Sequence, residues 1–150
     1  MNGKHSTTQK QMEEIKMINN KNIKDDGKKL YVSDEELCVD ELYSKTVEFL
    51  HGHVYWLNEY KDTQHTDEYR AECYQKWFEH REKVRKVIMT SHLTTDERFV
   101  MIATYLYDDY PTPDKVAERT GYTKADVTKY HAKGFVKAAK KLQQNKMINI

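Results

Sequence analysis

Residues 113–133 read PDKVAERTGYTKADVTKYHAK. Two helical segments, 113–120 and 123–142, flank a turn of about four residues, which is the pattern of a helix-turn-helix. Pro113 suits the first position of a helix, and Gly121 supplies the positive φ that a tight turn needs. A small side chain at Ala117 lets the two helices approach each other. The residues expected to form the core of this motif are Val116, Ala117, Gly121, Tyr122, Val127 and Tyr130.

The second helix of such a motif enters the major groove of DNA, where side chains near its N-terminus meet base edges. Lys124 and Lys129 can donate to guanine or to phosphate, and Thr128 can bond to several bases. Lysines farther along the same helix would mainly meet phosphates. The candidate DNA-binding residues are Lys115, Arg119, Thr123, Lys124, Ala125, Thr128, Lys129, Lys133 and Lys137, with Lys140 and Lys141 continuing the basic helix.

A resemblance extends from this motif to the segment before it. The residues that carry it are Leu93–Arg98, Val116–Thr123 and Val127–His131. They resemble region 4 of bacterial sigma factors, and they are more similar still to small phage and prophage regulators of the ArpU and RinA type. The likeness covers about residues 93–142 and implies transcription control of phage genes, with activation as the expected outcome. Sigma-like recognition helices usually carry arginine here, so lysine indicates modest base specificity.

Charge is distributed unevenly along the chain, although the net charge is only +1. Residues 1–32 carry +3, residues 33–110 carry −8 and residues 111–150 carry +6. The basic C-terminal segment is suited to a polyanion, because neutralising phosphates releases counterions. DNA should repel the acidic middle segment, which is therefore expected to face solvent or a protein.

Two long helices are predicted upstream. The first spans 33–60, opens on a capping box formed by Ser33 and Glu36, and has Gly52 as a bend or a close helix contact. The second opens at Thr66, and the short connection between the two favours an antiparallel hairpin. Their apolar stripes are Val39, Tyr43, Val47, Leu50, Val54 and Leu57 on the first helix, and Tyr69, Cys73, Trp77, Val84 and Ile88 on the second.

A third helix leads from the hairpin into the motif. Thr95 is its expected N-cap, and the stretch 108–111 ends it. Its expected core face is Phe99, Val100, Ile102, Ala103 and Leu106. The sequence therefore predicts an all-α protein with an N-terminal helical hairpin followed by a C-terminal sigma-region-4-like helix-turn-helix bundle. The predicted parts are a mobile arm (1–32), an acidic hairpin for protein interaction or dimerisation (33–92), the DNA-binding module (93–145) and a tail (146–150).

Neither a metal site nor a catalytic site is predicted. His51 and His53 are expected to be surface imidazoles, and Cys38 and Cys73 buried, reduced thiols, because zinc needs three or four converging ligands. The sequence has no glycine-rich phosphate loop and no hydrolase motif, so it predicts no cofactor and no enzyme. Trp56, Tyr74 and Phe78 fall beside the apolar stripes. They are expected to pack between the hairpin and the module, with a dimer surface as the alternative.

These patterns predict a sequence-specific transcriptional regulator of phage or prophage genes in the cytoplasm of a bacterial host. No apolar run is long enough to span a bilayer, and Met1–Lys10 lacks the apolar core of a secretory signal. The expected partners are duplex DNA, RNA polymerase and a second copy of the chain. Two alternatives stay open, namely a DNA-packaging adaptor similar to a phage small terminase subunit, and a protein-interaction module or inhibitor that binds no DNA.

Overall fold

The computed structural model describes the backbone of residues 34–148 and side chains from residue 41 onward, and this part of the chain is helical without strands. The predicted all-α class is confirmed. The predicted arm 1–32, the Ser33 cap and the Cys38 side chain lie outside the described residues. The helices are α2 (Asp34–Leu50), α3 (Gly52–Lys61), α4 (Asp67–Thr90), α5 (Thr95–Tyr105), α6 (Pro113–Thr120) and α7 (Lys124–Gln144).

A threonine N-cap directly precedes four of these helices. In each, the hydroxyl accepts a hydrogen bond from the backbone N–H three residues later, at 3.1 to 3.2 Å, which satisfies one donor of the first turn. The predicted cap Thr95 is wrong by one residue. Thr94 is the N-cap of α5, because Glu97 closes a capping box on it, whereas Thr95 has Arg98 three residues on and no carboxylate to return the bond. The four caps are Thr66, Thr94, Thr112 and Thr123.

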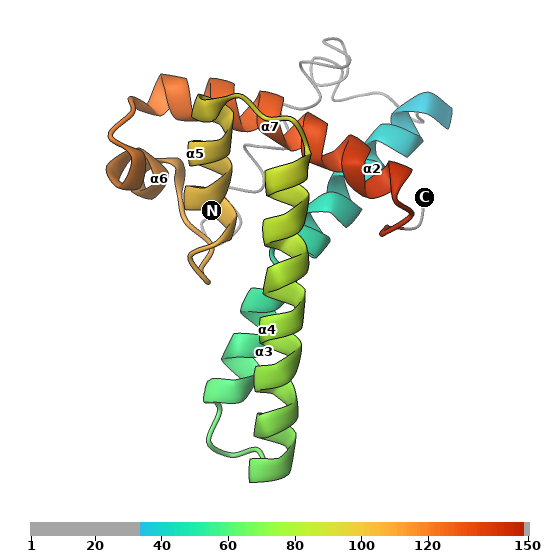
Figure 1. Cartoon of the computed structure of the whole chain (residues 1–150), viewed down its shortest axis with the longest axis vertical. Coiled ribbons are helices and arrows are strands. Elements are labelled where there is room, and N and C mark those ends of the chain that lie inside the picture. The colour runs from blue at the N-terminus through green and yellow to red at the C-terminus, as the bar shows by residue number, and fades with distance from the viewer. Residues whose placement is uncertain (1–33, 149–150) are drawn as a thin grey trace, which may run out of the picture.

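The helices form a T-shaped arrangement (Figure 1). α7 lies across one end, α5 and α6 lie to one side of it and α2 to the other, and α3 and α4 project from it as an antiparallel pair. The predicted helix 33–60 is divided at His51, where α2 ends and α3 begins. A Cβ on Gly52 would lie 2.7 Å from His80 Nε2, so glycine permits the close approach of α3 to α4.

One hydrophobic core crosses the boundary expected between residues 92 and 93. It draws on both halves of the chain, and α7 contributes residues that contact α2, α4 and α5. Because the same cluster holds both halves, the hairpin and the C-terminal helices are packed as one body. The buried members of this cluster are Tyr43, Leu50, Val84, Val87, Ile88, Leu93, Met101, Tyr105, Leu106, Phe135, Ala138 and Leu142.

The buried face of α5 agrees with the predicted one at four of its five residues and differs at Phe99. Phe99 was expected in the core, but it is 52% exposed, while Met101 and Tyr105 are fully buried. The reason is that the buried stripe also contains the polar residues Glu97 and Thr104, both buried. Because polar residues interrupt the apolar pattern, hydrophobic periodicity alone places Phe99 on the buried face.

The two histidines beside Gly52 are buried, so the prediction of surface imidazoles is wrong. His53 Nδ1 lies 2.9 Å from Asp108 Oδ1, and its Nε2 lies 2.7 Å from the Tyr105 carbonyl oxygen. These contacts join α3 to the end of α5 and to the α5–α6 loop, which the sequence pattern did not indicate. Cys73 is a free, buried thiol as expected. Within the described part of the chain, no three His, Cys, Asp or Glu side chains are placed to hold a metal ion.

The aromatic side chains beside the stripes lie partly in solvent. Tyr74 is 48% exposed and Phe78 is 52% exposed, so the expectation that they pack between the hairpin and the module is wrong for both. The indole of Trp77 does reach the module, since its Nε1 donates to Asp108 Oδ1 at 2.8 Å. Over residues 34–148, no helix is long and apolar enough to cross a membrane.

Candidate nucleic-acid interface

α6 and α7 are joined by a turn of three residues, 121–123, around Gly121. Gly121 has a φ of +79°, and its N–H donates to the Ala117 carbonyl at 2.8 Å. The predicted core residues of the motif meet here. Val116 and Val127 are buried with Val100 and Ala103 of α5, and Ala117, Tyr122 and Tyr130 pack against this cluster.

Tyr122 fixes the turn to α5. Its hydroxyl donates to Asp96 Oδ1 at 2.5 Å. This hydrogen bond to a carboxylate raises the pKa of Tyr122 to about 12, because the neutral phenol is the form that can donate. The Tyr122 ring also lies 5.6 Å from the ring of Tyr130. The start of α7 is therefore held to both α5 and α6.

An exposed basic stripe runs along α7. Ala125, Lys129, Lys133 and Lys140 recur at steps of four and seven residues, which places them on one side of a helix. The opposite side of α7 is buried in the two clusters. Among the described residues, Lys129, Lys133 and Lys140 lie in no ion pair, although Lys129 Nζ lies 5.0 Å from the centre of the Tyr130 ring. We call Lys129, Lys133 and Lys140 the α7 basic face; Lys124, the first residue of α7, lies outside this stripe.

The residues around the start of α7 have different surroundings. Lys124 is exposed and lies 3.4 Å from Asp114. Thr128 is half-buried at the edge of the stripe. Thr123 uses its hydroxyl as the cap of α7. Lys115 is exposed and pairs with Glu118 at 3.2 Å, one helical turn along α6.

Two predicted DNA contacts are engaged inside the protein and do not join the α7 basic face. The side chain of Arg119 is only 14% exposed. Its guanidinium donates to the Ala103 carbonyl at 2.8 Å, pairs with Asp109 and stacks 4.2 Å from the centre of the Tyr107 ring. Because all these partners belong to the end of α5 and the α5–α6 loop, Arg119 secures this loop to α6.

Lys137 is the second such residue. Its Nζ donates to Glu97 Oε1 at 2.6 Å, and the Glu97 side chain is 5% exposed. Burial raises the pKa of Glu97, but the hydrogen bonds from Lys137 and Thr94 outweigh burial and hold that pKa below its ordinary value. Sequence reasoning missed Glu97 as a partner, although the Thr94-x-x-Glu97 capping pattern was the available signal.

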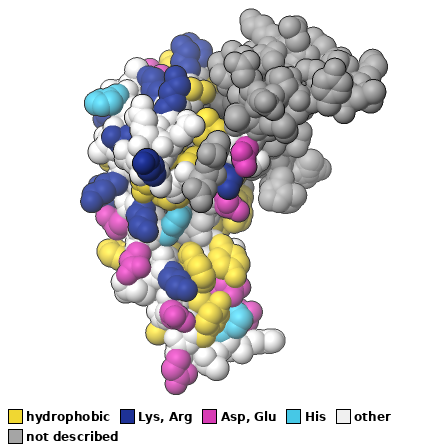
Figure 2. Space-filling view, turned by 90° about the vertical axis from the view of Figure 1, so that its right-hand side faces the viewer, with side chains coloured by type: hydrophobic (Ala, Val, Ile, Leu, Met, Phe, Trp, Pro, Cys, Tyr) yellow, Lys and Arg dark blue, Asp and Glu magenta, His cyan; other side chains and the backbone are white. Residues whose placement is uncertain are grey.

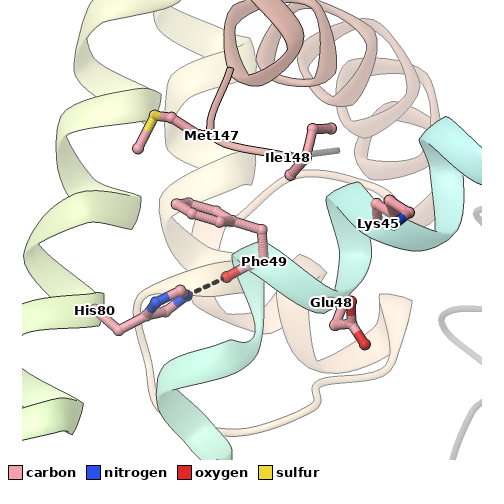
Figure 3. A pocket seen from close by; sticks show the side chains of 6 residues that line it. All are labelled: Lys45, Glu48, Phe49, His80, Met147 and Ile148. Atoms are coloured by element: carbon pink, nitrogen blue, oxygen red, sulfur yellow. Dashed lines mark hydrogen bonds between the residues drawn. The ribbon is translucent and has the colours of Figure 1, made fainter. Parts of the chain in front are cut away.

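A pocket of about 310 Å³ lies elsewhere, between α2, α4 and the residues that follow α7 (Figure 3). Phe49, Met147 and Ile148 supply apolar walls, and His80 Nε2 is held 2.6 Å from the Phe49 carbonyl oxygen. Lys45 and Glu48 lie at its edge on α2. The His80 ring is thus bound to backbone, and none of the lining residues belongs to the α7 basic face.

No protein-family model, curated protein or solved structure matches this chain. Geometry and charge are therefore the features of this chain that bear on its function. Figure 2 shows Lys and Arg side chains gathered in the upper half of the molecule, where α7 lies. In the lower half, where the hairpin lies, the charged side chains are mostly Asp and Glu and lie beside a group of hydrophobic side chains. The segregation of charge in the sequence is thus also a segregation in space.

Replacing Gly121 tests how much the turn depends on a left-handed backbone. We expect Gly121→Ala to destabilise the fold by about 1–2 kcal/mol, which is the cost of a Cβ at this φ. No atom lies within 4 Å of such a Cβ, so steric overlap adds nothing. Gly121→Asn should cost less, because Asn tolerates the left-handed region. Equal stability of Gly121→Ala and the parent protein in urea denaturation would contradict this account of the turn.

Proposed function

We propose that this protein is a sequence-specific DNA-binding regulator of transcription in phage or prophage genes, and that it acts by binding rather than by catalysis. The observation that carries the proposal is the α7 basic face. Its lysines lie on the exposed side of a helix that follows a tight turn, and the other side of this helix is fixed by α5 and α6. A helix presented in this way can enter a major groove.

The proposed contacts divide by position along α7. Lys124, Ala125, Thr128 and Lys129 lie near the N-terminal end of the helix, where side chains reach base edges. Lys133 and Lys140 continue the stripe and would meet phosphates, with Lys115 on α6 as a further phosphate contact. Thr123 stays the cap. Arg119 and Lys137 are left out of the proposed interface, because their charged groups are held by Asp109 and Glu97.

The hairpin supplies the protein-binding surface in this proposal. Its far end, residues 58–75, is acidic with a net charge of −3, so DNA would repel it while the α7 basic face is attracted. A second copy of the chain and RNA polymerase are the two partners proposed for it, and a cytoplasmic site of action follows from both.

Fluorescence anisotropy with duplex DNA tests the proposal. The probes are a duplex from around the protein's own gene and a scrambled duplex of equal length, in a salt series that includes about 150 mM. We expect tighter binding to the native duplex than to the scramble at that salt. Equal, salt-labile binding to both would replace the regulator with a packaging or architectural role. Binding to neither would overturn the DNA-binding proposal and leave a protein-interaction module.

Lysine substitutions test the proposed face directly. Lys129→Ala is expected to weaken binding to the native duplex by about 1–3 kcal/mol, roughly 5- to 150-fold, if Lys129 contacts a base. Lys124→Ala should also weaken binding. The matched control is Lys61→Ala, which removes an exposed lysine from the far end of α3. Unchanged affinity in both α7 variants would exclude this face as the DNA-binding surface.

A further inference from the structure

The outer face of α4 presents apolar side chains to solvent on the part of the hairpin that projects from the core. Tyr74, Phe78 and Met89 are 48%, 52% and 41% exposed. They belong to a series with steps of four, three, four, seven and four residues, which keeps every member on one side of the helix. We call this series the α4 outer face, and its members are Asp67, Ala71, Tyr74, Phe78, Arg85 and Met89.

The centre of this face is aromatic. The ring of Trp77 lies 5.2 Å from that of Tyr74 and 6.5 Å from that of Phe78, so the three rings form one surface. Tyr60 of α3 extends it, with its ring 5.2 Å from Tyr74. Adjacent exposed aromatic rings are unusual on a protein that works alone, and such residues are enriched in protein–protein interfaces.

Charge reverses along α4 on either side of this centre. Residues 67–75 carry a net charge of −2, whereas residues 76–86 carry +3. On the outer face itself, Asp67 stands at one end with its side chain 99% exposed. Arg85 stands toward the other end with its side chain 44% exposed, and Glu82 of the same side lies 2.9 Å from its guanidinium. A face with opposite charges at its two ends is complementary to its own copy in antiparallel orientation and repels it in parallel orientation.

The spacing fits such a pairing. Asp67 and Arg85 lie equally far from residue 76, and so do Tyr74 and Phe78. With a two-fold axis at residue 76, each Tyr74 faces Phe78 of the second copy, and each Asp67 faces Arg85 of the second copy. The paired stretch is roughly 27 Å long at 1.5 Å per residue. Contacts repeated in both directions are the property of an isologous interface.

We propose that a second copy of this chain binds antiparallel to the α4 outer face, with aromatic pairs at the centre and Asp67–Arg85 pairs at both ends. The charge reversal favours a second copy of the chain over RNA polymerase as the partner, because the α4 outer face is complementary to itself. The inference does not depend on DNA binding, and the test is made without DNA. If the protein is monomeric and still binds the native duplex, the dimer proposal is disproved and the DNA-binding proposal stands.

Sedimentation equilibrium of the full chain, over roughly micromolar to millimolar concentrations that suit a small interface, measures the association. We expect a monomer–dimer equilibrium. Asp67→Lys and Arg85→Glu should each weaken it about tenfold or more, since each places like charges opposite each other at both ends. The double variant should restore association to within about threefold of the parent, because both pairs are re-formed with reversed signs.

Aromatic substitutions supply a second readout. Phe78→Ala should abolish the dimer in the same concentration range. The matched control is Phe99→Ala on α5, which removes an equally exposed phenylalanine from another surface and should leave the dimer unchanged. A monomer at all concentrations, or a charge-reversed double variant no better than its parent single variants, would overturn the proposal.

Discussion

Lowering the pH from 7 to 5 is expected to remove about 4 kcal/mol from the free energy of unfolding, mainly through two buried histidines. Burial lowers the pKa of both His51 and His131 from 6.5 to about 3, and for each the largest cause is loss of hydration of the charged ring. Both rings have a buried Nδ1 that makes no hydrogen bond among the described residues. Burial also lowers the pKa of His80.

The sign of this effect follows from the proton balance. Below pH 6.5 the unfolded chain binds protons at these histidines, while the folded protein keeps them neutral down to about pH 3. Stability is therefore fully present above pH 6.5 and is lost as the pH falls through that window. The slope approaches about 1.4 kcal/mol per pH unit for each histidine. Most domains are stable by about 5–15 kcal/mol, so mild acid should bring this protein close to unfolding.

Urea denaturation at pH 7, 6 and 5 measures the loss, and His131→Gln assigns it. His131 Nε2 lies 2.7 Å from the Tyr105 hydroxyl, and an amide can keep that hydrogen bond without titrating. The variant should lose about 2 kcal/mol less than the parent over this range. His92→Asn is the control, because His92 is exposed and its φ of +59° suits asparagine. Stability independent of pH between 7 and 5 would contradict the buried, neutral state.

Phe135→Ala is expected to cost about 3–5 kcal/mol, because it empties a site at the centre of the shared core. Phe135 is 1% exposed on α7, and its ring lies 5.0 Å from Tyr43 of α2 and 5.4 Å from His131. Phe99→Ala provides the matched control. Phe99 is 52% exposed on α5, and surface substitutions commonly change stability by about 0.5 kcal/mol or less.

The same variant tests whether the chain unfolds as one unit. Both tryptophans, Trp56 and Trp77, lie on the hairpin helices α3 and α4, so tryptophan fluorescence follows the hairpin while circular dichroism follows all helices. If one core holds both halves, Phe135→Ala shifts the two transitions together. A shift seen by circular dichroism but not by fluorescence would show that the hairpin unfolds separately.

Local signals in the sequence predicted the helices well. The caps Thr66, Thr112 and Thr123, together with Pro113 and Gly121, each satisfy a requirement of the residues beside them, so they can be recognised without knowing the rest of the fold; the cap of α5 was misplaced by one residue. Burial was harder to predict, as Phe99 and His53 show. Phe99 is exposed because the buried face of α5 is partly polar, and His53 is buried because Asp108, 55 residues later, lies against its ring.

The candidate interface was predicted in the same uneven way. The exposed lysines of α7 follow from helical spacing, which is local. Arg119 of α6 and Lys137 of α7 are also basic, but ion pairs with Asp109 and Glu97 hold their charged groups. The partner of a charged side chain depends on which helices meet, and a single sequence contains no direct record of that.

Because α7 both carries the proposed DNA-binding face and lines the shared core, a fragment limited to 93–145 would lack the neighbours of Phe135 and Leu142 on α2 and α4. Such a fragment would place their apolar surface in water and would be prone to aggregate. For the same reason, transferring these helices into another protein requires that the hairpin be transferred with them. The hairpin and the C-terminal helices are therefore expected to be inherited together, and an engineered protein should keep both.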